Sequence, residues 1–469
     1  MMPGDCLERT DNRGNDRVIL GLICLLAIVK GLIFSSIRPI WSPIDEMQHF
    51  HYIQYVAETG HLPIQGETLM SRENKALGAR LHSSEKQGWP PHLESDPDPE
   101  ARLWLGSFSY EAWQPPLYYF LMTPLYLISG PGLVRSIHLL RAANIFIMAL
   151  TVLFTYRIAK AVFPYAESVA LGSALLVALI PGFSGPTTQI TNDSLSGLFG
   201  AVVVFLTLRH GVAAHFPTKS CAIIGLLLGL SVLVKINGGF LLPPVLLVIV
   251  LDAVVAGRKV GSLAKSLIIV MLLFLVTVTP WLLWNFAHYG ALTAAAVQRQ
   301  LLPMKLQGVP ELSWQWLARG LRILIYGPWH SGRVGGMWPF LSRLTRYVTN
   351  IGIALSGWLL FSEFVFRKAD VVHQISLLFI LVTAIVTFAG VLGGPFYTKA
   401  DVIECRFLLP GLAPISVLFT AGFPLVIPER HRRYWLLAFL AFLLFMNVVC
   451  IVPTFLHYYS FNFYPRIHL

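Results

Sequence analysis

The sequence is poor in charged residues. Of its 469 residues only 13% are Asp, Glu, Lys or Arg, whereas 55% are hydrophobic. A soluble globular domain has about 25% charged residues, so this composition excludes an ordinary soluble protein. The uncharged runs are long, and about 20 apolar residues are enough to cross a bilayer as a helix. The composition therefore predicts a polytopic membrane protein.

A cysteine pattern and a basic domain are also missing. The five cysteines lack the spacing of metal ligands, so no disulfide framework or zinc site follows from them. The formal net charge is +11, which could indicate nucleic-acid binding. However, Lys and Arg occur in short clusters between apolar runs, where they act as orientation signals. We expect no nucleic-acid partner.

Apolar runs predict an all-α protein with about eleven transmembrane helices. They lie near residues 18–37, 139–158, 166–183, 193–208, 219–235, 239–256, 266–284, 347–366, 371–393, 407–427 and 434–456. The first run has no small-residue cleavage pattern, so we expect a retained helix rather than a signal peptide. Basic clusters fall at alternate ends of the runs, and those ends should be cytoplasmic. We expect a plasma (inner) membrane protein with a cytoplasmic N-terminus.

Residues 115–130 are apolar but short, and they contain Pro124. If they crossed the membrane, every later basic cluster would change sides and the charge bias would fail. We therefore expect a re-entrant or interfacial segment on the outer side.

Two long connections should lie on the outer side, at residues 38–115 and 285–346. The second contains a predicted amphipathic helix in the membrane interface. Its apolar face is predicted to carry Trp314, Leu317, Leu321 and Leu324, opposite Gln315, Arg319 and Arg322. We expect residues 1–469 to form one transmembrane domain without a soluble C-terminal domain.

The stretch at residues 42–60 follows the first run directly and carries two acids and two histidines. Ser42 as N-cap and Pro43 at the first helical position predict a helix over residues 43–59. The apolar residues of this helix, among them Met47, Ile53 and Val56, are expected to face the membrane. Asp45 lies three residues after Ser42. It either takes part in the chemistry of the site or only caps the helix as part of a capping box.

Polar residues gather at the outer ends of the predicted spans. They are Asp45, Glu46, Glu111, Gln114, Asn192, Asp193, Lys235, Asn285, Tyr289 and Arg406. Ionisable groups at a membrane boundary are costly, so their convergence indicates a functional site. Simpler explanations stay open, because Lys235 and Arg406 could snorkel and Asn192 with Asp193 could cap a helix. A carboxylate near a bilayer can serve as a general base, and Lys or Arg can hold the phosphate of a lipid-linked leaving group.

The order of several motifs resembles the GT-C superfamily of integral-membrane glycosyltransferases, which use polyprenyl- or dolichyl-phosphate sugars. This superfamily includes the protein O-mannosyltransferases and the aminoarabinose transferase of lipid A. The motifs lie at residues 42–46, 49–52, 114–119, 191–195, 235–239, 280–290 and 404–410. Together they extend over most of the chain.

The resemblance implies transfer of a sugar from polyprenyl phosphate to an envelope glycan, lipid or protein in one inverting displacement. Asp45 would be the general base, and Glu46 would assist it or bind the acceptor. Lys235 and Arg406 would bind the donor phosphate. Donor or acceptor contacts would come from His49, Gln114, Asn192, Asp193 and Asn285. No metal is required in this mechanism, although Asp45, Glu46 and His49 could bind a divalent ion.

Two alternatives stay open. One is a transporter or flippase of a lipid-linked saccharide, with Lys235 and Arg406 lining its path. The other is a non-catalytic partner of an envelope polymerase. Transporter sites lie near the bilayer midplane, whereas these polar residues lie at one membrane face, which favours the enzyme.

Overall fold

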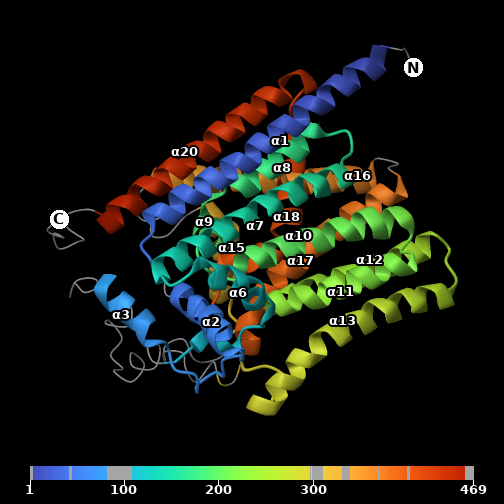
Figure 1. The fold of residues 1–469 in the computed structure, drawn as a ribbon. Coiled ribbons are helices and arrows are strands. Elements are labelled where there is room, and N and C mark those ends of the chain that lie inside the picture. Colours follow the sequence, from blue (N-terminus) through green and yellow to red (C-terminus); the bar gives the residue numbers. More distant parts are fainter. Residues whose placement is uncertain are drawn as a thin grey trace.

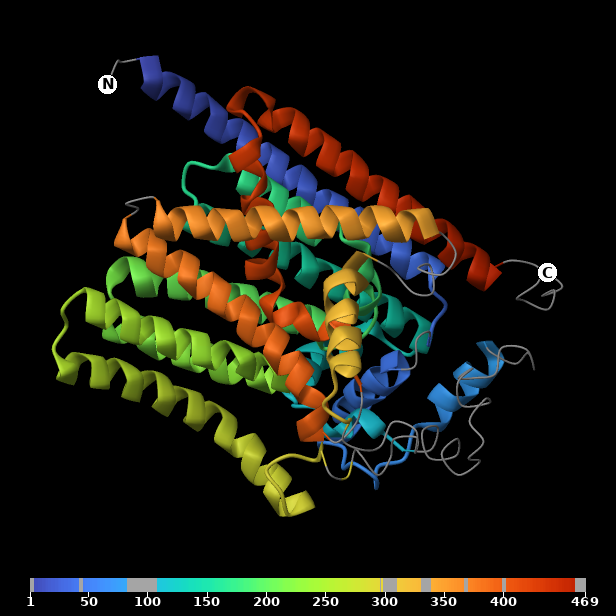
Figure 2. The same ribbon diagram turned by 180° about the vertical axis from the view of Figure 1, so that it is seen from behind.

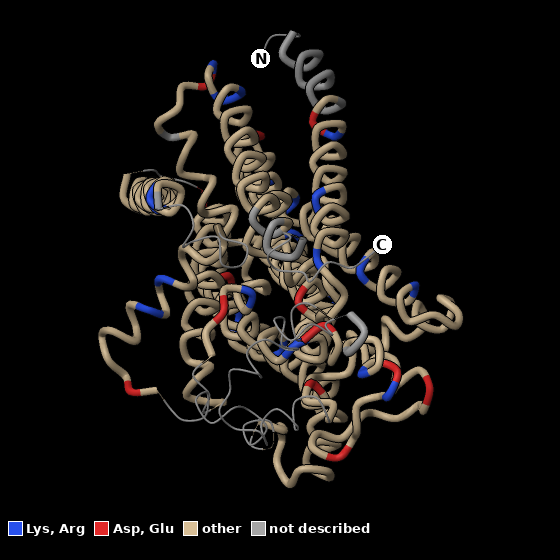
Figure 3. The backbone as a smooth tube through the Cα atoms, turned by 90° about the vertical axis from the view of Figure 1, so that its left-hand side faces the viewer, with Lys and Arg blue, Asp and Glu red and all other residues tan. Residues whose placement is uncertain are grey.

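The computed structural model describes residues 4–41, 45–81, 108–295, 297, 310–329, 339–366, 370–398 and 402–459, and these are helical apart from loops and one isolated bridge. The long helices lie side by side, with α1 and α20 along one edge and α13 along the other (Figure 1). Charged positions are sparse along them (Figure 3). This arrangement confirms the predicted all-α polytopic fold.

The main helices are α1 (Gly4–Ile37), α7 (Leu133–Val162), α8 (Glu167–Leu179), α10 (Asp193–Leu206), α11 (Thr218–Val234), α12 (Leu242–Val255), α13 (Val260–Tyr289), α16 (Pro339–Val365), α17 (Val371–Thr398), α18 (Leu412–Ala421) and α20 (Arg432–Tyr459). Shorter helices are α2 (Asp45–Thr59), α3 (Arg72–Leu81), α6 (Leu117–Ser129), α9 (Ser184–Thr188), α15 (Trp314–Tyr326) and α19 (Phe423–Val426). The 3-10 helices are η2 (Tyr110–Trp113), η3 (Pro181–Phe183), η5 (Val212–Ala214), η6 (Ile236–Leu241), η8 (Gly327–Trp329), η10 (Cys405–Gly411) and η11 (Glu429–His431), and η4 (Thr207–Gly211) is a π-helical turn.

Every predicted span coincides with a helix or with consecutive helices, but the count of eleven is not confirmed. Among the described residues, eight helices are long and apolar enough to cross a membrane. A ninth results if α8 and the bent segment Pro181–Thr188 count as one span. The helix α11 and the segment Cys405–Ala421 are apolar but shorter. The helix α11 ends just before the 3-10 helix η6, and the segment Cys405–Ala421 consists of the 3-10 helix η10 followed by α18.

The break after α8 has a sequence cause. Proline at 181 cannot donate a backbone hydrogen bond, and the residue before it is held in an extended conformation. Ile180 accordingly has φ −61° and ψ 122°. The ammonium group of Lys30, on α1, donates to the Ile180 carbonyl at 3.2 Å. An otherwise costly lysine within an apolar helix thus satisfies a carbonyl at the end of α8.

The helices α2, α3 and α6 gather at one end of the bundle (Figure 1). Met47, Ile53 and Val56 of α2 are buried in a protein cluster with Tyr118 and Tyr119. The expectation that these residues face the membrane is therefore wrong, because α6 covers the apolar face of α2. With 13 residues, α6 is too short for a complete span.

The predicted amphipathic helix is present as α15, which lies across the direction of the long helices (Figure 2). Its face differs from the prediction, since Trp314 is 85% exposed and Trp316 is only 7% exposed. Trp316 and Leu324 pack with Val391 of α17 and with Leu408. The apolar side of α15 is thus covered by protein, and its placement in a membrane interface stays a prediction.

Candidate active site

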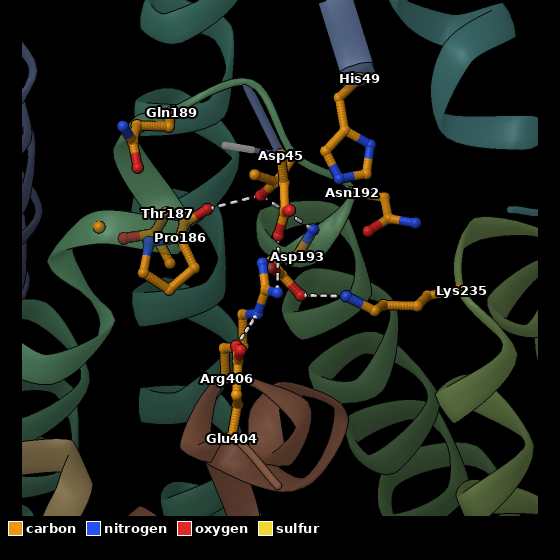
Figure 4. A network of polar contacts seen from close by, with 12 residues as sticks. Asp45, His49, Pro186, Thr187, Gln189, Asn192, Asp193, Lys235, Glu404 and Arg406 are labelled. Atoms are coloured by element: carbon orange, nitrogen blue, oxygen red, sulfur yellow. Dashed lines mark hydrogen bonds and ion pairs between the residues drawn. The ribbon is translucent and has the colours of Figure 1, made fainter. Parts of the chain in front are cut away.

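Four chain segments meet at one end of the bundle. The helix α10 begins there, and α11, which runs antiparallel to it, ends there. The start of α2 and the start of η10, with Glu404 just before it, complete the site (Figure 4). Together they bring five charged side chains into one network, called the charged cluster below. It consists of Asp45, Asp193, Lys235, Glu404 and Arg406.

The guanidinium of Arg406 is the centre of the charged cluster. Its Nη2 lies 2.7 Å from Oδ2 of Asp45, and its Nη1 lies 3.7 Å from Oδ2 of Asp193. Its Nε pairs with the carboxylate of Glu404. The Nζ of Lys235 lies 2.5 Å from Oδ1 of Asp193. Charges of opposite sign therefore alternate through the network, which is the arrangement that stabilises ionised groups away from water.

A glycine on α10 allows Arg406 to approach Asp193. A Cβ atom added at Gly200 would lie 2.0 Å from the carbonyl oxygen of Pro410. Any side chain at position 200 would therefore push η10 away from α10. Arg406 is on η10 and Asp193 begins α10, so the two residues lie on elements that pack closely at Gly200.

Lys235 reaches the charged cluster because regular helix stops just before it. The last residue of α11 is Val234, and Lys235 is extended, with φ −157° and ψ 137°. The chain then turns into η6. The ammonium group also lies 5.3 Å from the ring centroid of Phe407, within cation–π range. Lys235 is 7% exposed, so it does not snorkel to water.

The charged cluster has an accessible side and a buried side. The side chains of Glu404, Arg406 and Asp45 are 45%, 21% and 17% exposed. Those of Lys235 and Asp193 are 8% and 1% exposed. A substrate that reaches the charged cluster would therefore first meet Asp45, Arg406 and Glu404.

Asp45 is held as an anion. Burial alone would raise the pKa of its carboxyl group, but Arg406 and a hydrogen bond from the Tyr110 hydroxyl outweigh burial and lower the pKa to about 2. Both carboxylate oxygens thus have partners from outside α2. The proposed N-cap Ser42 and the adjacent Pro43 lie outside the described residues.

A chain of amides lies beside the charged cluster. Gln114 donates from Nε2 to Oε2 of Glu111 at 2.8 Å, and its Oε1 accepts from Asn192 at 3.1 Å. Asn192 also donates to the Val234 carbonyl at 3.1 Å. Burial, together with the negative charge of Asp45, raises the pKa of Glu111 to about 7. Glu111 can therefore hold a proton near neutral pH.

His49 is buried beside this network as a neutral imidazole. Its Nδ1 lies 2.8 Å from the hydroxyl of Tyr119, and the two rings stack at 5.9 Å. Burial lowers the pKa of His49 to about 3. At neutral pH this histidine is a hydrogen-bonding group and not a cation.

Glu46 lies in a different environment. Its two oxygens accept from Nε and Nη2 of Arg141, each at 2.6 Å, and from the backbone amides of Trp41 and Ile190 at 3.1 and 3.2 Å. Arg141 also donates to the carbonyls of Ser35, Arg38 and Pro39. The role predicted for Glu46 as a catalytic or acceptor-binding group stays a prediction, and these contacts favour a structural role.

Asn285 also makes local contacts. It is fully buried near the end of α13, and its Nδ2 donates to the Leu292 carbonyl at 3.2 Å. This bond closes the turn that follows the helix. No described contact connects Asn285 with the charged cluster, and its predicted role in donor or acceptor binding stays a prediction.

Three important residues were not among the predicted site residues. Arg141 falls inside the predicted span 139–158, and an arginine within an apolar run is a signal that could have found it. Glu404 is two residues before Arg406 and pairs with it in the structure. The sequence pattern around Glu404 does not indicate this pairing. Tyr110 begins the 3-10 helix η2 and has no sequence signal.

Metal coordination is not evident in the described part of the chain. No group of three or more His, Cys, Asp or Glu side chains there is arranged to hold a metal ion. The carboxylates of Asp45, Asp193 and Glu404 all face Lys235 or Arg406. Independence from metals stays a prediction.

Comparisons with known proteins agree with the helical fold described above. Residues 113–284 match the family model for dolichyl-phosphate-mannose-protein mannosyltransferases. No curated protein matches the sequence. ArnT from Cupriavidus metallidurans, solved bound to undecaprenyl phosphate, has a TM-score of 0.51 at 15% identity, over 93% of this chain and 75% of that one. The apo oligosaccharyltransferase of Archaeoglobus fulgidus has a TM-score of 0.50 at 15% identity, over 95% of this chain and 56% of that one.

This chain therefore spans little more than half the length of the oligosaccharyltransferase and three quarters of ArnT. At this level of identity the likeness concerns the fold. The helical bundle and the structural neighbours show a GT-C-like fold, and the family match over residues 113–284 agrees with the motifs in the sequence. Eight of the described helices are long and apolar enough to cross a membrane.

Proposed function

We propose that this protein is a glycosyltransferase that moves a sugar from a polyprenyl-phosphate donor to an envelope acceptor. The observation that carries this proposal is the partly exposed charged cluster, in which Asp45 lies 2.7 Å from Arg406 and Lys235 is adjacent. Group transfer from a lipid phosphate needs a base for the acceptor and cations for the leaving phosphate, and the cluster supplies both. The similar protein ArnT has been solved with undecaprenyl phosphate bound.

The proposed reaction is a single displacement. Asp45 accepts the proton of an acceptor hydroxyl. At the same time the oxygen of that hydroxyl bonds to the anomeric carbon of the sugar. The bond from that carbon to the phosphate oxygen breaks on the opposite face, so the configuration inverts. The electron pair stays on the phosphate, and Arg406 and Lys235 stabilise the charge of the departing polyprenyl phosphate.

Donor binding would strengthen Asp45 as a base. With Arg406 beside it, the pKa of Asp45 is about 2, which describes a weak base. When Arg406 turns toward the donor phosphate, its guanidinium moves away from Asp45, and the pKa of Asp45 rises. The acceptor is thus activated best when the donor is already in place.

An apolar cavity supports a lipid-linked donor. It has a volume of about 410 Å³ and lies among α15, α16, α17 and α18. Leu408 and Leu412, which follow Arg406 in the chain, line it, together with Phe388 and Trp329. These side chains suit part of an isoprenoid chain, because its burial removes apolar surface from water.

Helix direction supports an extracytoplasmic active site. The helix α10 runs from the charged cluster at Asp193 toward Arg209, and α11 returns from Lys219 to Lys235. The basic pair Arg209 and Lys219 therefore lies at the opposite end, which the positive-inside rule assigns to the cytoplasm. The outer segments within residues 38–115 are then the candidates for acceptor recognition. A cluster at the ends of helices also favours an enzyme over a transporter.

The test is release of polyprenyl phosphate by purified protein in lipid nanodiscs. A panel of polyprenyl-phosphate sugars is supplied with host envelope extract as acceptor, for wild type, Asp45→Asn and the control Asp370→Asn. Asp370 is exposed just before α17. We expect release by wild type and control and its collapse in Asp45→Asn. Equal release by a folded Asp45→Asn would contradict the assignment of the base.

A further inference from the structure

The guanidinium of Arg406 faces a carboxylate on each of its three nitrogens. Nη2 faces Asp45, Nη1 faces Asp193 and Nε pairs with Glu404. A phosphate binds arginine through these same N–H groups, often through two of them at once. The Nε atom of Arg406 makes no hydrogen bond within the described part of the chain, and the carboxylate beside it is that of Glu404. A phosphate that approaches Nε must therefore compete with Glu404 for charge and space.

The three carboxylates differ in what their release would cost. Asp193 is 1% exposed and Asp45 is 17% exposed, so either would leave an ion with little access to water. Each also has a second partner, Lys235 for Asp193 and Tyr110 for Asp45. The side chain of Glu404 is 45% exposed, so its carboxylate can exchange Arg406 for water. An ion that can be rehydrated is the least costly to release.

We propose that the carboxylate of Glu404 occupies the place of the donor phosphate on Arg406 and is exchanged for that phosphate when the donor binds. This proposal rests on the proposed function, because it takes a lipid phosphate as the ligand. The backbone permits the exchange. Glu404 is extended, with φ −132° and ψ 142°, and precedes η10, so its side chain can turn outward without unwinding a helix.

The formal charge of the charged cluster agrees with an exchange. Three carboxylates face two cations, so the cluster already carries a net negative charge and would repel an added phosphate. When Glu404 leaves, two carboxylates and two cations remain. The single negative charge of a phosphodiester then restores the original balance. The glutamate thus keeps Arg406 neutralised between reactions and competes with both donor and product.

The experiment measures binding of undecaprenyl phosphate to the purified full-length chain in detergent micelles. Removing a competing, partly exposed ion pair should tighten binding by about fivefold in Glu404→Gln, since such pairs contribute up to about this factor. Glu404→Ala is a second variant with the same expected direction. The matched control is Glu429→Gln, which removes an exposed pair with Arg432 and should leave binding unchanged. Thermal unfolding checks that each variant is folded.

The outcomes separate the two proposals. Tighter binding in both Glu404 variants, with the control unchanged, supports the exchange. If wild type binds and the folded Glu404 variants bind equally or more weakly, the exchange is overturned and the proposed function stands. If wild type binds no undecaprenyl phosphate, the exchange and the proposed function both fall.

Discussion

Asp45 and Glu46 are adjacent in the sequence, and each pairs with one arginine, yet their surroundings differ. Glu46 and Arg141 have side chains that are 0% and 1% exposed, whereas Asp45 and Arg406 are 17% and 21% exposed. Glu46 accepts four hydrogen bonds, two of them from backbone amides. Asp45 shares its arginine with two other carboxylates.

The difference lies in whether partners can be exchanged. The contacts of Glu46 tie the start of α2 to α7, to the end of α1 and to the chain before α10, and no substrate can reach them. The contacts of Asp45 lie on an accessible side where a phosphate can compete for Arg406. A saturated buried pair fixes geometry, whereas a partly exposed pair with exchangeable partners can do chemistry. We therefore expect Glu46 to hold the start of α2, and with it Asp45, in place.

The largest effect on stability is expected from a substitution that breaks the buried pair of Glu46 and Arg141. In Glu46→Gln the buried guanidinium of Arg141 loses its counterion, which typically costs about 3–5 kcal/mol. We expect a large fall in the thermal unfolding temperature in detergent and loss of activity with it. The control Glu167→Gln removes the partly exposed pair with Lys160 and should cost less than about 1 kcal/mol. Equal falls in both variants would show that Glu46 and Arg141 do not hold the fold.

The second effect separates activity from stability. Asp45→Asn should reduce the single-turnover rate of polyprenyl phosphate release by about 10²- to 10⁴-fold, because general base catalysis contributes that much. Its unfolding temperature should fall less than that of Glu46→Gln, since Arg406 keeps Asp193 and Glu404 as partners and the amide retains its size. A variant that is unstable as well as inactive would place Asp45 with Glu46 as a structural residue.

The third effect concerns the shape of the cation. Arg406→Lys keeps the charge but loses the planar fork that binds phosphate through two N–H groups. We expect undecaprenyl phosphate to bind about tenfold more weakly, as for loss of one charge-assisted hydrogen bond. Arg209→Lys, an exposed substitution at the other end of α10, is the control. Unchanged binding in Arg406→Lys would remove Arg406 from the donor site.

The smallest effect depends on pH. The pKa of Glu111 is raised to about 7 in the folded protein, above its ordinary value of 4.5. The folded state therefore holds this proton more tightly than the unfolded state, and stability falls as pH rises from about 4.5 through about 7. Glu111→Gln should lose this component, so its unfolding temperature should exceed that of wild type by a margin that grows toward pH about 8.

A double variant sharpens this pH test. Asp45→Asn removes the negative charge that helps to raise the pKa of Glu111, so the margin should shrink when Glu111→Gln is compared in that background. The measurement is the unfolding temperature at several pH values in one detergent. Parallel pH profiles for wild type and Glu111→Gln would contradict the assigned pKa shift.

Much of the bundle could be predicted from hydropathy. Each apolar run coincides with helical structure, because a chain in lipid must satisfy its backbone hydrogen bonds within the helix. Basic clusters alternate between the two ends of successive apolar runs, and this alternation predicted Asp45, Asp193, Lys235 and Arg406 at the same end. The structure brings these residues together there. The number of full-length spans was harder to predict, since the regular helix α11 stops where η6 begins and α18 starts only after η10.

The hydrophobic pattern could not predict which apolar helix faces pack against protein and which face lipid. Lipid and a protein interior are both apolar, so periodicity finds the face of α2 that carries Met47 and Ile53 without saying what covers it. The same holds for α15, where Trp316 is buried and Trp314 is exposed.

The sequence by itself determined a polytopic helical protein, the ends at which its polar residues lie, and motifs typical of the GT-C fold. The tertiary structure alone decided the pairing of charges. Glu46 and Arg141 are 95 positions apart, and no local spacing indicates that they meet or that Asp45 meets Arg406 instead. Pairing depends on how closely the helices approach, which glycines such as Gly200 control through contacts far away in the chain.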